Sequence, residues 1–85
     1  MKKPQRVNIL GTRFKVEHAD LIPEGLFGDC DVDNKIIRIE QTLEGKSFKE
    51  TLTHEKFHAM LRLSGIAELL TDELEEALCR LVERL

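Results

Sequence analysis

Residues 52–61 read LTHEKFHAML, and the spacing of their side chains predicts an α-helix in the second half of the chain. On an α-helix that advances about 100° per residue, His54 and His58 lie on one face, about 40° apart. Lys49 and Lys56 fall nearly opposite them. If the lysines face solvent, the two histidines point into the protein.

The limits of this helix are marked by residues that stabilise helix ends. Ser47 stands three residues before Glu50, the pattern of a capping box at a helix N-terminus. Gly65 suits the left-handed conformation that ends many helices. The sequence therefore predicts a helix from Ser47 to about Leu63.

A second helix is predicted over residues 71–85, with Thr71 or Asp72 as its N-cap and acidic residues in its first turn. Its leucines recur at intervals of four, three and four residues, which predicts an apolar stripe that faces the core. These leucines are Leu74, Leu78, Leu81 and Leu85.

The N-terminal half has the alternation and the β-branched residues that are typical of strands. Short strands are predicted at Val7–Leu10 and Arg13–Val16, and a third over 35–40, KIIRIE. Residues 19–34, between the second and third strands, are interrupted by proline and glycine and are predicted to be loop. Three short strands followed by two helices predict a small α+β fold, a single domain over residues 1–85.

Composition excludes several classes of protein. The net charge of -3 leaves no basic surface for nucleic acid, so we expect no nucleic-acid partner. No apolar run is long enough to span a membrane, and no apolar signal segment follows the basic start. We therefore expect a cytoplasmic protein in which Cys30 and Cys79 stay reduced.

The H-E-x-x-H motif of His54 to His58 predicts a metal site. Two imidazoles at i and i+4 on one helix face can bind one zinc ion through neutral ring nitrogens. Glu55 projects beside the pair, where it can accept a proton as a general base. The alternative is a pair of core histidines bonded to backbone carbonyls, with Glu55 solvated beside Arg62.

A catalytic zinc needs a third protein ligand and one open position. On a helical projection of residues 71–85, Glu75 lies nearest the expected buried side, followed by Glu76 and then Glu73. We therefore predict Glu75 as the third ligand. The alternatives are that all three glutamates are solvated and support the helix dipole, or that Cys79 binds the metal as a soft ligand.

Residues 29–40, DCDVDNKIIRIE, match much of an EF-hand calcium loop. Asn34 occupies the position that favours glycine, and β-branched residues fill the second half of the segment. We predict an acidic turn that leads into a strand, without calcium.

TLTHEKFHAMLRLSG followed by DELEEALCRLVERL resembles the zincin metallopeptidases of the gluzincin kind. The whole chain resembles the short H-E-x-x-H proteins encoded by phages and prophages and, more distantly, the ImmA/IrrE-type peptidases that cleave repressors. The resemblance implies a zincin-like fold and a peptide or protein substrate. It also implies that His54 and His58 bind zinc, that Glu55 is the general base, and that an acidic residue of ELEE is the third ligand.

The chain departs from these families in the groups that handle substrate. It has no tyrosine to stabilise an oxyanion, so Arg62, His18 or the metal alone would serve. A peptide could pair with an exposed edge strand, for which IIRIE, residues 36–40, is the candidate.

Two classes of function follow from this interpretation. The first is a minimal zinc metallopeptidase. The second is a structural or regulatory module that zinc stabilises without catalysis, because a small core benefits from a metal.

Overall fold

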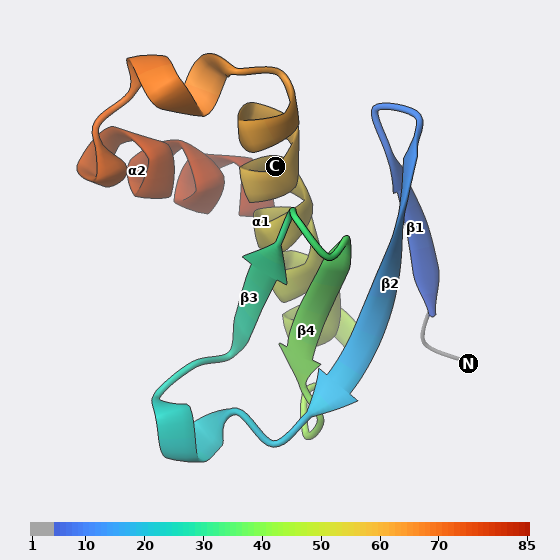
Figure 1. The fold of residues 1–85 in the computed structure, drawn as a ribbon. Helices are drawn as coiled ribbons and strands as arrows, with labels where there is room; N and C mark the ends of the chain where they lie inside the picture. The colour runs from blue at the N-terminus through green and yellow to red at the C-terminus, as the bar shows by residue number, and fades with distance from the viewer. Residues whose placement is uncertain (1–4) are drawn as a thin grey trace.

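The computed structural model describes residues 5–85 and shows a four-stranded sheet followed by two helices (Figure 1). The strands are β1 (Arg6–Ile9), β2 (Thr12–Ala19), β3 (Gly28–Asp31) and β4 (Ile36–Glu40). The helices are α1 (Gly45–Leu63) and α2 (Asp72–Glu83). The short 3-10 turns η1 (Ile22–Glu24) and η2 (Ile66–Leu69) precede β3 and α2. The α+β class is confirmed.

The number of strands was predicted wrongly, because β3 lies in the segment expected to be loop. β3 pairs antiparallel with β4, so that Asp29 stands opposite Arg38. The guanidinium of Arg38 donates to both carboxylate oxygens of Asp29, one of these bonds measuring 2.8 Å. This strand is held by cross-strand pairing, which local composition does not reveal.

The acidic segment forms the hairpin turn between β3 and β4, as expected. The carboxylate of Asp31 accepts hydrogen bonds from the backbone and the side-chain amide of Asn34, at 3.1 and 2.8 Å. Asp29 is held by Arg38 on the neighbouring strand. The carboxylate of Asp31 therefore stabilises the turn, and that of Asp29 stabilises the pairing of β3 with β4.

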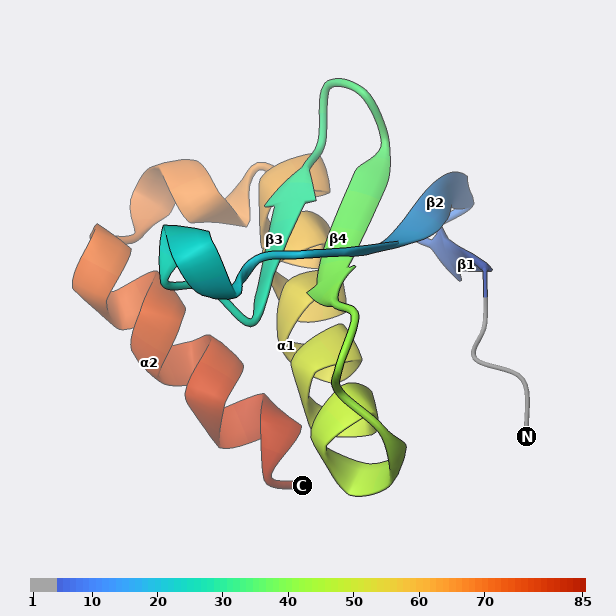
Figure 2. The ribbon, with the colours of Figure 1, turned by 90° about the horizontal axis from the view of Figure 1, so that it is seen from below.

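The sheet has the strand order β1-β2-β4-β3, in which β2 and β4 are parallel and the other pairs are antiparallel. The segment IIRIE is β4 and lies between two strands, so the prediction that it forms an exposed edge is wrong. The edge strands are β1 and β3. Of these, β3 runs beside the helices (Figure 2).

Helix α1 packs on one face of the sheet and closes the main core (Figure 2). It begins at Gly45 with Glu44 as N-cap and no side-chain bond at the cap, so the expected capping box at Ser47 is not formed. It ends at Leu63, and Gly65 has the expected left-handed conformation, with φ of 84°. The core side chains are Ile9, Phe14, Val16, Ile37, Ile39, Phe48 and Ala59.

Helix α2 begins as predicted, because the Thr71 side chain accepts a hydrogen bond from the Leu74 backbone at 3.1 Å. The prediction that its leucine stripe faces the core is wrong. Leu74 is 54% exposed and Leu81 59%, whereas Glu75 and Cys79 are buried. The helix meets α1 through a cluster of glutamate, histidine and arginine side chains.

A buried carboxylate ties the end of β4 to the loop that follows β2. One oxygen of Glu40 accepts from the backbone N–H of Leu21 at 2.8 Å and of Ile22 at 3.2 Å. The other accepts from the backbone and hydroxyl of Thr42, at 2.9 and 2.6 Å. The Thr42 hydroxyl, followed by the backbone N–H donors, lowers the pKa of Glu40 to about 2.

Glu40→Gln is therefore expected to destabilise the fold in a pH-dependent way. Because the folded pKa is depressed, the stabilising effect is present above the ordinary value of 4.5 and is lost as the pH falls towards 2. We expect the variant to melt about 10 °C below the wild type at neutral pH. The gap should close below pH 3, as measured by thermal unfolding across pH. Glu68→Gln, at an exposed position, is the control, and a gap that is constant with pH would contradict the assignment.

Among residues 5–85, no helix is long and apolar enough to cross a membrane.

Candidate metal centre

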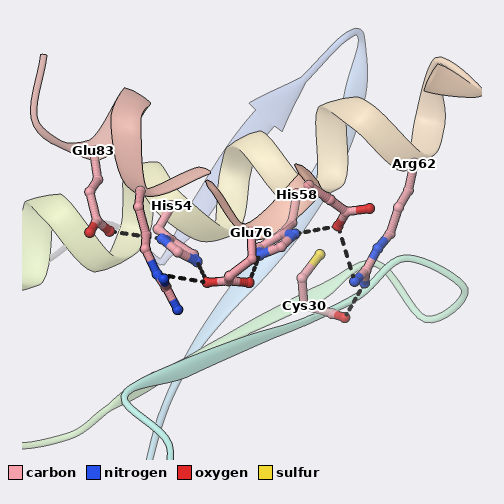
Figure 3. Close-up of polar contacts among 8 residues, drawn as sticks. Cys30, His54, His58, Arg62, Glu76 and Glu83 are labelled. Carbon is pink, nitrogen blue, oxygen red and sulfur yellow. Dashed lines mark hydrogen bonds and ion pairs between the residues drawn. The ribbon is translucent and has the colours of Figure 1, made fainter. Parts of the chain in front are cut away.

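His54 and His58 lie on α1 and point towards α2, as the sequence predicted (Figure 3). Their side chains are 13% and 11% exposed, and the ring centroids are 4.9 Å apart. The i, i+4 spacing brings the rings together because α1 is regular between them. The two imidazoles therefore form one cluster with the polar side of α2.

All four ring nitrogens of the pair lie against carboxylates of α2. The outer nitrogen of His54, Nδ1, is 2.8 Å from Glu83, and that of His58 bonds to Glu75. Both inner nitrogens, Nε2, face one carboxylate, that of Glu76, at 2.8 Å for His54 and 3.1 Å for His58 (Figure 3). Glu75 and Glu83 therefore lie beside the Nδ1 atoms, whereas Glu76 lies beside both Nε2 atoms.

If the carboxylate beside Nδ1 accepts a proton from that nitrogen, the imidazole is the tautomer whose Nε2 lone pair can bind a metal. Glu75 and Glu83 have this position. Glu75, predicted as the third ligand, lies behind His58, whereas Glu76 lies where the two Nε2 atoms converge.

Glu55 is the buried carboxylate of α1 in this region. It is 7% exposed and makes no hydrogen bond within residues 5–85. Burial raises its pKa, while His58 and His54 act in the opposite direction. It is not solvated beside Arg62, as the core-histidine alternative supposed.

Strand β3 approaches α1 closely beside Glu55 because residue 28 is glycine. A Cβ at Gly28 would stand 2.9 Å from the Thr51 side chain and 3.2 Å from Cγ of Glu55. The absence of a side chain therefore lets the edge strand pack against the turn of α1 that carries the carboxylate. β3 and α1 form two walls of an open pocket of about 1000 Å³, into which His54, Glu55 and His58 face.

The charges of the cluster favour a divalent cation. Glu55, Glu75, Glu76 and Glu83 surround the two imidazoles. Arg62 lies 3.5 Å from Glu75, and Arg80 lies 3.9 Å from Glu76. With neutral imidazoles, four carboxylates and two guanidinium groups leave two negative charges, which one divalent cation would neutralise.

Among the described residues, the one group of three potential ligands close enough together to hold a single ion consists of His54, His58 and Cys79, without a glutamate. Cys79 is therefore an alternative to Glu76. Its sulfur and one ring nitrogen from each histidine lie within 4.8 Å of one another. The side chain is fully buried, and burial, followed by Glu76 and Glu75, raises the pKa of the thiol to about 12. Neither Cys79 nor Cys30 forms a disulfide.

Of the other residues that the sequence singled out, Arg62 lies at the site, whereas His18 and Glu73 lie outside it. Arg62 lines the pocket and donates to the backbone carbonyl of Cys30 at 3.3 Å (Figure 3). His18 lies on β2 and stacks on Phe48, with ring centroids 5.6 Å apart. Glu73 is exposed on α2. Glu83 was not among the predicted site residues, although it stands seven residues after Glu76, a spacing that returns to the same helix face.

No protein-family model matches the chain, and the curated proteins and solved structures contain no significant match to it.

Proposed function

We propose that the protein is a small zinc-dependent metallopeptidase whose metal is held by His54, His58 and Glu76. The observation that supports this most directly is the division of the carboxylates, with Glu75 and Glu83 on the outer nitrogens and Glu76 between the inner ones. Glu76 replaces Glu75 as our preferred third ligand. The donor set of two imidazoles and a carboxylate suits zinc at a catalytic site.

Glu55 is the proposed general base. Zinc, when bound, would polarise a carbonyl group and make water more acidic. Glu55 faces the pocket from the same turn as His54 and makes no hydrogen bond within the described chain, so its oxygens are free to accept a proton from water. It would then return that proton to the leaving amine.

A peptide substrate could pair with the outer edge of β3. This strand borders the pocket, and only its other edge is paired, with β4. Backbone pairing would position a peptide without a large binding lobe. Arg62, at the same wall, is placed to stabilise negative charge on a carbonyl oxygen, whereas His18 is committed to Phe48.

Zinc content per chain is the experiment that tests the proposal. Protein purified without chelator should contain about one zinc per chain, and His54→Ala should contain none. His18→Ala is the matched control, since this histidine lies outside the site, and it should keep the metal. Absence of zinc from the wild type, after zinc has been offered, would refute the proposal.

The same assay separates a ligand from a residue that only orients a ligand. Glu76→Ala should abolish stoichiometric binding, whereas Glu75→Gln and Glu83→Gln should weaken it by about 10–100-fold. Glu73→Ala, at an exposed position on the same helix, should have no effect. Loss of zinc in Glu75→Gln but not in Glu76→Ala would restore Glu75 as the third ligand.

A zinc-stabilised module without catalysis is the second candidate, and the position of Cys79 favours it. With Cys79 as an additional ligand, the metal would have a full coordination shell and no open position. Cobalt substitution distinguishes the two, because thiolate ligation produces an intense charge-transfer absorption. Its presence, and its loss in Cys79→Ser, would support the module.

A further inference from the structure

The leucine stripe, made of Leu74, Leu78 and Leu81 on α2 and Leu85 just after its end, is an apolar face that residues 5–85 leave partly uncovered, with Leu78 half-buried. Leu74 is 54% exposed, Leu81 59% and Leu85 97%. Their intervals of four, three and four residues are those of the seam along which two helices pack side by side. The stripe is therefore suited to another helix rather than to the interior of its own domain.

Charged residues on the free side of the stripe indicate which helix fits. On a helical projection, Glu73 and Arg84 lie on the same side of the stripe, within about 20° of each other. They are near opposite ends of the helix, about 16 Å apart along its axis. The other side of the stripe adjoins Glu75 and Cys79, which are buried against α1. The flank that carries Glu73 and Arg84 is exposed; it also carries Arg80 and borders the pocket of the candidate metal site, and it is acidic at its start and basic further along.

We infer that a second copy of this chain packs on the stripe, with the two α2 helices antiparallel and related by a two-fold axis. In such a pair, the free flank of one copy faces the same flank of the other. Glu73 of each copy then stands near Arg84 of its partner, twice in the dimer. In a parallel pair the free flank of one copy would instead face the flank of its partner that carries Glu75 and Cys79, which α1 already covers, so Glu73 and Arg84 would not meet.

The interface is short, so the dimer is weak. One helix of 12 residues on each side buries less than a standard protein interface, and we expect a dissociation constant of about 1–100 µM. Leu69, 85% exposed immediately before α2, adds apolar surface at the acidic end. The inference does not depend on the metal or on catalysis.

Sedimentation equilibrium over about 1–500 µM protein tests the inference, a range chosen to bracket the expected affinity. The mass should rise from the 9.8 kDa of one chain towards twice that value. Leu81→Lys should remain at the mass of one chain throughout, and Leu10→Lys, which changes an exposed leucine in the β1–β2 turn, should behave as the wild type. A wild type that stays monomeric at the highest concentration, or a Leu81→Lys dimer, would overturn it.

Charge reversal tests the antiparallel arrangement and covers the case in which Leu81→Lys fails to fold. Glu73→Arg and Arg84→Glu should each weaken dimerisation by about tenfold, since each places like charges together twice. The double variant recreates both pairs with their signs exchanged and should recover to within about threefold of the wild type. A double variant no stronger than the weaker single variant would contradict the antiparallel pairing.

Discussion

Replacement of Glu55 by glutamine is expected to reduce peptide hydrolysis by about 10²- to 10⁴-fold, the usual contribution of a positioned general base. The amide keeps the shape of the carboxylate but cannot accept the proton from water. The zinc should stay, because Glu55 makes no contact with the Nε2 atoms comparable to that of Glu76. Turnover can be followed with a pool of fluorogenic peptides, and metal content by elemental analysis.

Glu50→Gln is the matched control for this experiment. Glu50 lines the same pocket from the same helix, and its carboxylate pairs with Lys46 at 3.6 Å rather than with the histidines. It should retain near wild-type hydrolysis. Undiminished turnover by Glu55→Gln would exclude Glu55 as the base, and zinc-loaded wild type without any turnover would favour the non-catalytic module.

The inward position of the histidine pair could be predicted because it depends on one regular helix. The helical projection places His54 and His58 opposite Lys49, and in the structure both rings lie against α2. The H-E-x-x-H spacing alone therefore located the pocket. The orientation of the two histidines could therefore be predicted without information about α2.

The predicted order of burial, Glu75 before Glu76 before Glu73, is confirmed, but which ring nitrogen each glutamate faces could not be predicted, because this depends on how α2 is rotated about its own axis. The leucine stripe suggested a buried side centred on Leu74 and Leu81, but the structure turns these outward and buries Glu75 and Cys79. At this contact α2 turns its glutamates, rather than its leucines, towards the imidazoles of α1. An exposed apolar stripe also signals a surface for another chain, and a single sequence does not distinguish the two.

Strand β3 is a second feature that the local sequence could not predict. Pro23, Gly25 and Gly28 indicated a loop, and the loop does occupy the first part of that segment. The strand forms afterwards because β4 offers a free edge and Arg38 meets Asp29 across it. Gly28 then acts as a point of close approach to Glu55 rather than as a strand breaker.

Zinc is expected to raise the melting temperature by about 15–30 °C. Ligand at 1,000 times its dissociation constant stabilises a fold by about 4 kcal/mol, and each kcal/mol is worth about 4–8 °C in a domain of this size. The effect should be large here because α2 meets α1 mainly through the glutamate and histidine cluster, with Cys79 as its only fully buried apolar side chain. A metal held by His54 and His58 on one helix and Glu76 on the other would join the two helices directly.

Thermal unfolding with added zinc, and then with chelator, measures this effect. The chelator should return the melting temperature to its metal-free value. His54→Ala should show no zinc-dependent shift, whereas Glu73→Ala, which changes an exposed carboxylate of the same helix, should shift as the wild type does. If zinc and chelator leave the wild type unchanged, the two histidines and their carboxylates hold the helices together without a metal. Both the metallopeptidase and the zinc-stabilised module would then be excluded, because each requires the helices to share one ion.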